Sequence, residues 1–138
     1  MLASLFAAGL GATSAPAFAE VVVVVSAKSA ATSLNAEQAA DIFLGKSSTL
    51  PGGGAAVPVD QAEGSSVRDE FYNKAAGKSG AQLKAYWSKQ IFTGKGRPPK
   101  DVGDNGAVKS LIAANPNMIG YIDKSAMDDS VKALVSIK

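Results

Sequence analysis

The residue types best suited to bind a ligand lie in the segment Gly64–Arg68, which follows a short apolar run. Gly64 allows the backbone to approach a ligand closely, and Ser65 and Ser66 place hydroxyl groups at the start of the helix expected next. The unpaired N–H groups and the positive dipole end of a helix N-terminus favour an anion. Either serine is also a typical helix N-cap, so anion binding and simple capping are both interpretations of this segment.

A second group of candidate residues lies in the Gly- and Pro-rich segment 93–104. Lys95, Arg97 and Lys100 put three cations within six residues. Such a group can hold a phosphate or an acidic partner. The alternative is a solvated loop with no ligand.

Other chemistry is limited by composition. The 138 residues include no Cys and no His, so thiol nucleophiles, histidine bases, disulfides and Cys/His metal sites are excluded. Asp60, Glu63, Asp69 and Glu70 lie close in sequence, but two of them open a helix, where the helix dipole explains them. No nucleophile is paired with a base, so we predict no catalytic residue, no metal and no cofactor. The 14 basic and 12 acidic residues give +2, spread thinly, which argues against a nucleic-acid partner.

The first nineteen residues, MLASLFAAGLGATSAPAFA, carry no charged side chain. They combine an apolar stretch at Leu2–Leu10 with the small-x-small sequence Ala17-Phe18-Ala19, which is typical of signal-peptidase cleavage. The stretch is shorter than the ~20 residues that span a bilayer, and it lacks the basic start of an ordinary signal peptide. The alternative is a buried N-terminal helix. We predict cleavage after Ala19, export, and one mature domain over residues 20–138.

Hydrophobic patterning predicts alternating strands and helices. Val21–Val25 is apolar on both faces, as in a strand that is covered on both sides. Capping pairs at Asn35 with Gln38 and at Ser79 with Gln82 mark two helix starts. The expected order is strand 21–25, helix 36–44, strand 57–59, helix 67–76, helix 80–92, helix 106–115 capped by Asn105, strand 118–122 and strand 131–137. This alternation predicts a small α/β layer with helices on both faces of the sheet.

The helix expected at 80–92 supplies part of the core. Leu83, Trp87 and Ile91 are spaced at i, i+4 and i+8, which favours one buried face. Trp87 could instead stack on a ligand, but this spacing favours packing. The predicted core residues are Val23, Phe43, Phe71, Leu83, Trp87, Ile91 and Ile119.

The order of these segments resembles that of periplasmic phosphate-binding proteins of ABC transporters. The similarity extends over Val21–Asp123 and rests on VVVVV, LNAEQAADIFLGK, PGGG, VPVDQAEGSSVRDEFY and NPNMIGYID. In that family a strand ends in an Arg, and Gly-Ser-Gly-Thr then opens a helix whose N-terminus binds phosphate. The resemblance implies an α/β fold of the type II periplasmic-binding-protein class, here as a single lobe.

The ligand-binding motif of that family is altered in this chain. Gln61 falls at the position of the family's Arg, Glu63 at that of its Asp, and Ser66-Val67 replaces Gly-Thr. Glutamine can donate a hydrogen bond but lacks the bidentate charge by which arginine selects phosphate. Arg68, one position after Val67, is expected to compensate in part. The ligand-binding residues that the resemblance implies are Gln61, Gly64, Ser65, Ser66 and Arg68.

The resemblance implies a periplasmic solute-binding protein that takes phosphate or another small anion and delivers it to an ABC permease. The family's opposite lobe has no counterpart in these residues, and self-association is one way to supply the missing wall of the cleft. The alternative is a periplasmic interaction module that has kept the fold but lost the solute. In that case the Lys95–Lys100 loop is expected to contact a protein partner.

Overall fold

The structure is a computed structural model, and it describes residues 20–51 and 54–138. The elements are β1 Val21–Ser26, α1 Ala36–Phe43, β2 Val57–Asp60, α2 Ser66–Ala76, α3 Gly80–Phe92, β3 Lys100–Asp101, α4 Asn105–Ala114, β4 Met118–Asp123, a 3-10 turn at Lys124–Ala126, and β5 Val131–Ile137. The segment 1–19, for which the sequence predicts a signal peptide, lies outside the described residues.

The strands form one mixed sheet in the order β3-β2-β4-β1-β5. Strand β1 lies between β4 and β5 and runs antiparallel to both, whereas β2 runs parallel to the central strand β4 and to the short β3. All five valines of β1 are buried: Val21, Val23 and Val25 pack into one core cluster, and Val22 and Val24 pack into the other. The prediction of a strand covered on both faces is therefore confirmed.

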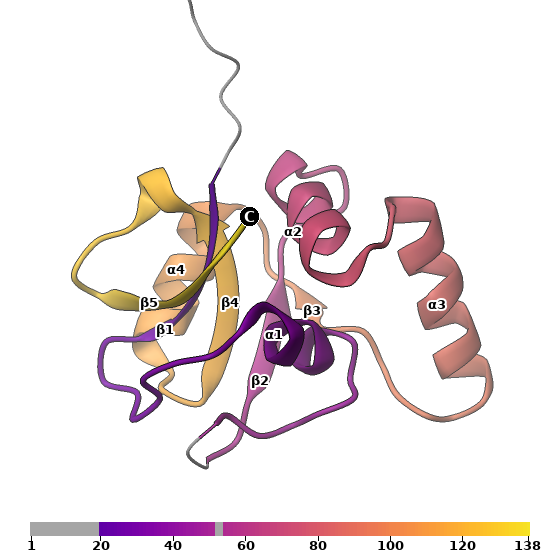
Figure 1. Cartoon of the computed structure of the whole chain (residues 1–138), viewed down its shortest axis with the longest axis horizontal. Coiled ribbons are helices and arrows are strands. Elements are labelled where there is room, and N and C mark those ends of the chain that lie inside the picture. Colours follow the sequence, from indigo (N-terminus) through magenta and orange to yellow (C-terminus); the bar gives the residue numbers. More distant parts are fainter. Residues whose placement is uncertain (1–19, 52–53) are drawn as a thin grey trace, which may run out of the picture.

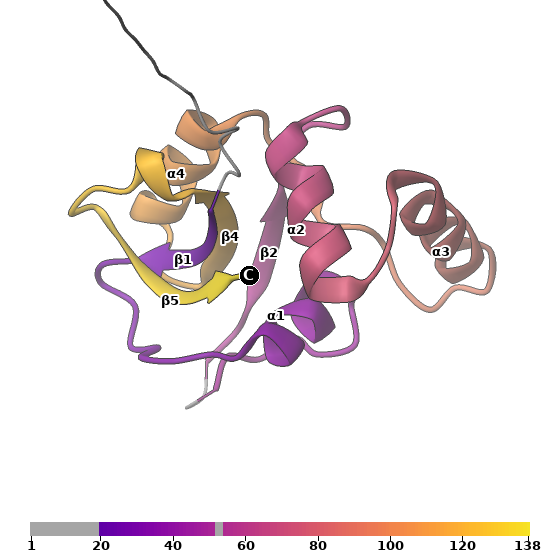
Figure 2. The same ribbon diagram turned by 45° about the horizontal axis from the view of Figure 1, so that its top comes forward.

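Helices cover both faces of this sheet, as the sequence predicts. In Figures 1 and 2, α1 and α2 lie in front of the sheet, α4 lies behind it, and α3 lies at the outer edge beyond α2. Phe43 of α1 and Phe71 of α2 belong to the front core, and Val108 and Ile112 of α4 belong to the back core. None of the helices in the described part combines the length and hydropathy of a membrane span.

The N-caps of α1, α2 and α3 are residues that the sequence predicted, whereas the N-cap of α4 is a different residue. Reciprocal capping boxes form at Asn35 with Gln38 and at Ser79 with Gln82. The start of α4 was expected to be capped by Asn105, but Asp104 is the cap. Asn105 is the first residue of the helix, because its side chain accepts hydrogen bonds from residues of the β2–α2 turn and of β4 instead.

The predicted core is correct except at Ile91. Leu83 and Trp87 are buried, whereas Ile91 is 56% exposed. Ile91 lies eight positions after Leu83 in the helix. Since each residue turns the helix by about 100°, the Ile91 side chain points about 80° away from the direction of Leu83. The last turn of α3 therefore carries Ile91 off the face that packs on the domain.

Candidate functional site

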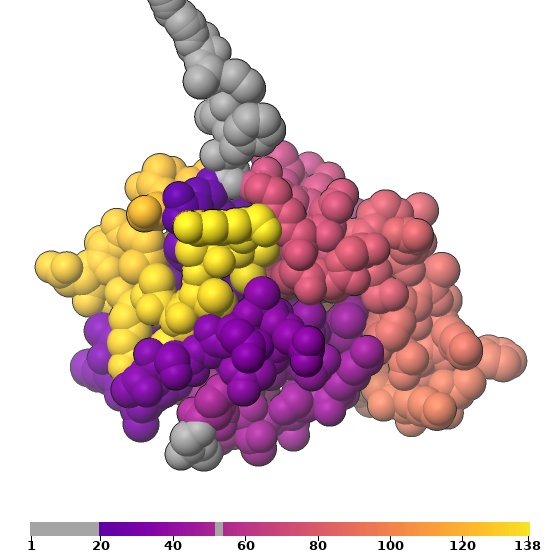
Figure 3. Space-filling model, viewed as in Figure 1, coloured from indigo at the N-terminus to yellow at the C-terminus, as the bar shows by residue number. Residues whose placement is uncertain are grey.

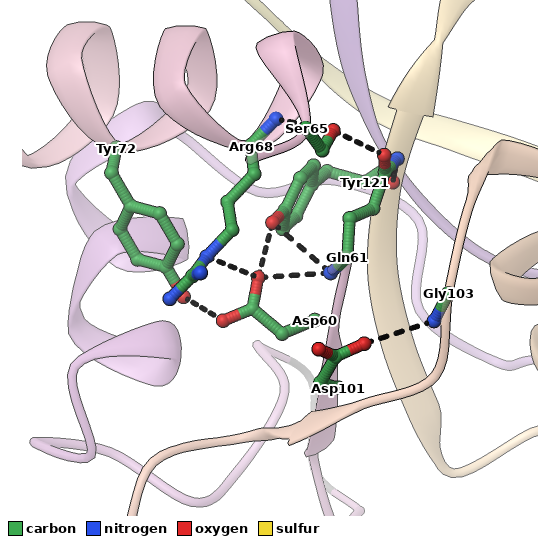
Figure 4. A network of polar contacts seen from close by, with 8 residues as sticks. All are labelled: Asp60, Gln61, Ser65, Arg68, Tyr72, Asp101, Gly103 and Tyr121. Atoms are coloured by element: carbon green, nitrogen blue, oxygen red, sulfur yellow. Dashed lines mark hydrogen bonds and ion pairs between the residues drawn. The ribbon is translucent and has the colours of Figure 1, made fainter. Parts of the chain in front are cut away.

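Gln61 joins four elements through a buried hydrogen-bond cluster. Its side-chain Nε2 donates to Asn105 Oδ1 at 2.8 Å and to the Tyr121 carbonyl oxygen at 3.0 Å. Its Oε1 accepts from Ser65 Oγ at 2.8 Å. Gln61 is only 2% exposed, and both of its amide N–H donors are used inside the protein. Figure 4 shows its contact with Ser65. In this arrangement the Gln61 side chain ties β2 to α2, α4 and β4.

Of the two candidate N-caps, Ser65 is the one that caps α2. Its Oγ accepts from the Arg68 backbone N–H at 3.1 Å, and Ser66 is the first residue of the helix. The turn before it depends on Gly64, whose φ of 96° lies in the left-handed region that favours glycine. The Ser65 hydroxyl is thus occupied, while Ser66 is exposed to solvent.

A hollow of about 620 Å³ lies between the N-termini of α2 and α4, and we call it the α2–α4 hollow. It is lined by Gln61, Ala62, Ser65, Ser66, Val67, Gly103, Asp104, Asn105 and Ala107. Two helix dipoles direct their positive ends toward it. The lining includes the Asp104 carboxylate and no Lys or Arg. The hollow therefore offers backbone N–H groups and hydroxyls to an anion, but no full positive charge.

Beside this hollow, a buried carboxylate organises a network that sequence analysis did not find. Asp60 Oδ2 accepts from Tyr72 Oη at 2.9 Å, and Asp60 Oδ1 accepts from Tyr121 Oη and from the Gln61 backbone N–H (Figure 4). Burial raises the pKa of Asp60 above its ordinary value, although the Tyr121 hydrogen bond and the Arg68 charge act against this rise. Burial beside this carboxylate also raises the pKa values of both tyrosines, so their hydroxyls stay protonated as donors.

Arg68 belongs to this network and not to the α2–α4 hollow. Its Nε lies 3.6 Å from Asp60 Oδ1, and its guanidinium carbon lies 5.8 Å from the centre of the Tyr72 ring. It lines a different hollow of about 530 Å³ between α2 and α3, the α2–α3 groove. The groove also includes Trp87 and Ile91. The structure thus places Gln61, Ser65 and Ser66 at one hollow, Arg68 at another, and Gly64 in the turn before α2.

The other candidate groups are solvent-exposed. Lys95, Arg97 and Lys100 all lie on the surface, and Lys100 begins β3, a strand that the sequence pattern did not reveal. Asp101 of the same strand accepts a hydrogen bond from the Gly103 N–H at 3.1 Å, which shapes the turn toward α4 (Figure 4). Across residues 20–51 and 54–138, no group of three carboxylates is arranged to hold a metal ion.

Comparison with known proteins identifies a fold relationship. No family model and no curated protein matches the sequence. A Clostridium perfringens structure, described as a phosphate ABC transporter substrate-binding protein with bound phosphate, matches with a TM-score of 0.65 and 26% identity over 83% of this chain and 44% of that chain. An ABC-type phosphate transport receptor from Vibrio cholerae matches with a TM-score of 0.65 and 21% identity, covering 83% and 45%. PstS from Borrelia burgdorferi matches with a TM-score of 0.61 and 15% identity, covering 83% and 46%.

The chain therefore has the α/β fold found in phosphate substrate-binding proteins of ABC transporters. It spans just under half the length of each of these three structures.

Proposed function

We propose that this chain is a solute-binding domain of the phosphate-transporter type that holds phosphate or another small anion in the α2–α4 hollow. The observation that carries this proposal is the convergence of two helix N-termini on one hollow. The N–H groups of a helix's first turn have no partner within the helix, so those of Ser66 and Val67 remain donors for a ligand. The Ser66 hydroxyl is exposed beside them. The bound phosphate in the Clostridium protein supports the choice of anion.

The expected affinity is low. The lining lacks Lys and Arg and includes the Asp104 carboxylate, so the anion gains no bidentate ion pair. Two or three charge-assisted hydrogen bonds at an open site suggest a Kd on the order of millimolar to tens of micromolar. Binding should weaken as ionic strength rises, because an exposed site is screened by salt.

A proline at the first helical position provides a sharp test. Ser66→Pro removes one N–H and one hydroxyl from the hollow while keeping a residue that suits this position. Gly80→Pro is the matched control, because it removes the corresponding N–H of α3 and an added Cβ there meets nothing within 4 Å. In calorimetric titrations with phosphate, we expect Ser66→Pro to bind about 5- to 10-fold more weakly and Gly80→Pro to bind like the wild type.

Arg68→Met shows, in the same titrations, which of the two hollows binds phosphate. It removes the guanidinium from the α2–α3 groove and leaves the α2–α4 hollow intact, so phosphate binding should persist. The proposal fails if neither phosphate nor sulfate binds up to ~10 mM at low salt. It also fails if Arg68→Met abolishes binding while Ser66→Pro does not.

Export and a permease partner belong to the same proposal. We infer that residues 1–19 are removed after Ala19, that residues 20–138 act in the periplasm, and that an ABC permease receives the loaded domain. Mass spectrometry of the protein from its host tests the first step: a chain that retains Met1 contradicts it.

A second candidate function is that of a periplasmic interaction module, which keeps the fold and contacts a protein partner without binding a solute. It is favoured by one observation: Ile91 and Phe92 stand side by side at the end of α3, and Phe92 is 91% exposed. Large apolar side chains next to each other on a surface often mark an interaction site.

A further inference from the structure

The positive charge of this chain is concentrated around α3, contrary to the even distribution expected from sequence. Between Phe71 and Lys100 there is no acidic residue, and there are seven basic ones: Lys74, Lys78, Lys84, Lys89, Lys95, Arg97 and Lys100. The remaining 7 basic and 12 acidic residues give the rest of the chain a net charge of −5. An overall charge of +2 therefore conceals a strongly basic segment in an otherwise acidic protein.

These cations are available to a partner. All but Lys78 are exposed, and Lys78 lies over the Tyr86 ring, with its Nζ 5.1 Å from the ring centre. Within the described residues, the one ion pair that this group makes joins Lys74 to Glu70 at 3.2 Å. The positive charges on α3 and on the loop after it are thus not neutralised by the protein itself.

An apolar tip lies within this basic surface. Ile91 and Phe92 form the last turn of α3, and Lys89 and Lys95 lie within three positions of Phe92 in the sequence. Figures 1 and 2 show α3 at the edge of the molecule farthest from β1 and β5. In Figure 3 the atoms of α3 and the following loop form the right-hand edge of the surface. The apolar pair can therefore reach a flat surface without interference from the sheet.

We propose that α3 and the loop to Lys100 bind an anionic phospholipid surface, with Phe92 and Ile91 entering the headgroup region. Cations that flank exposed apolar side chains on a helix are the pattern of interfacial membrane binding. Six of the seven cations are lysines, and lysine acts as a hydrated point charge that suits a diffuse field better than a shaped site. Glu63 and Asp69 line the α2–α3 groove from the side of α2, and Lys84 and Ile91 line it from the side of α3, so we expect the contact on α3 and its tip and not on α2.

An acidic protein partner is the rival occupant, and the structure favours lipid. A stable protein interface buries roughly 800 Å² on each partner around a packed apolar centre. The apolar part of this surface consists of two adjacent side chains at a helix end, which is enough for insertion among fluid headgroups. The inference does not depend on anion binding in the α2–α4 hollow.

Vesicle flotation with the full chain tests the inference. We expect binding to vesicles that contain phosphatidylglycerol, none to pure phosphatidylcholine, and release at ~0.5 M salt. Replacing Lys84, Lys89 and Lys95 together by Gln should lower the partition coefficient about 100-fold. Phe92→Ser should lower it about 5- to 10-fold without affecting the core, because the side chain is almost fully exposed.

A control variant that loses the same number of positive charges elsewhere shows whether the position of the lysines matters. Replacing Lys28, Lys46 and Lys138 by Gln removes the same net charge from exposed positions outside this surface. That variant should bind phosphatidylglycerol vesicles within about 3-fold of the wild type. Equal loss in the two triple variants, absence of binding at low salt, or binding to polyglutamate but not to vesicles would overturn the proposal. Phe92→Ser should leave the phosphate titration unchanged, so the two proposals can fail separately.

Discussion

Replacing Tyr72 by Phe tests whether the buried carboxylate is ionised and held by its hydrogen bonds. Tyr72 Oη donates to Asp60 Oδ2 at 2.9 Å, and both residues are buried. Within the described residues, Asp60 Oδ2 accepts no other hydrogen bond. The substitution removes this donor but keeps the ring, whose centre lies 5.1 Å from that of Phe71. Packing is therefore nearly unchanged, and the effect reports on the hydrogen bond.

The expected loss is about 2 kcal/mol of unfolding free energy, because a hydrogen bond to a charged group is worth about 1.5–3 kcal/mol. Tyr121 and the Gln61 N–H still satisfy the other oxygen of Asp60, which keeps the loss from being larger. The pKa of Asp60 is already raised by burial, and loss of the donor should raise it further.

The assay is urea unfolding followed by the fluorescence of Trp87, the single tryptophan of the chain. Tyr86→Phe is the matched control, since Tyr86 Oη donates to a neutral acceptor, the Leu44 carbonyl oxygen, at 2.7 Å. We expect it to cost about 1 kcal/mol or less. The loss of unfolding free energy in Tyr72→Phe exceeds that in Tyr86→Phe, and this difference should shrink as pH falls and Asp60 becomes protonated in the folded state.

Two results would refute this reasoning. Equal costs for the two Tyr→Phe variants at neutral pH would mean that the acceptor of Tyr72 carries no charge there. A cost for Tyr72→Phe that stays constant as pH falls through the titration of Asp60 would mean that the hydrogen bond is not linked to the carboxylate.

Three further predictions follow from the core, the network and the hollow. Trp87→Ala should cost about 3–5 kcal/mol and Ile91→Ala less than 1 kcal/mol, as measured by circular dichroism during thermal unfolding. The free energy of unfolding of the wild type, relative to that of Asp60→Asn, should rise as pH falls through the raised pKa of Asp60 in the folded state. It should level off below the pKa of Asp60 in the unfolded state. A difference that does not change with pH contradicts this prediction. Asp104→Asn keeps a good N-cap but removes a charge, so calorimetry should show phosphate bound about 3- to 10-fold more tightly.

Local patterns predicted the helix ends well because the atoms that form a cap lie within a few residues of one another. The capping boxes at Asn35 and Ser79 follow from such short spacing. Capping of α4 was predicted one residue too late, because Asp and Asn are equally good caps and only the fold shows which is free. Asn105 is engaged by Gln61, 44 positions away.

The candidate site was predicted less well, because its contacts depend on distance in space. Arg68 was expected to compensate in part for the positive charge that Gln61 lacks, at the same site as Ser66. Residues two apart on a helix are instead separated by about 200° around its axis. They therefore face different hollows. The partnership of Asp60 and Tyr121 spans 61 positions. The signal available in the sequence was the position of Asp60 directly after the apolar run 57–59, since a carboxylate that becomes buried there needs hydrogen-bond donors.

The charges around the α2–α4 hollow explain why a weak site is expected there. Two helix N-termini contribute roughly half a positive charge each, and the carboxylate of Asp104 offsets about that amount. Arg68 does not add to the balance, because it is paired with Asp60 on another side of α2. Gln61 is neutral and has used both of its N–H donors. An anion in this hollow would therefore be held by the directions of backbone N–H groups rather than by net charge, so discrimination between phosphate and sulfate should be small.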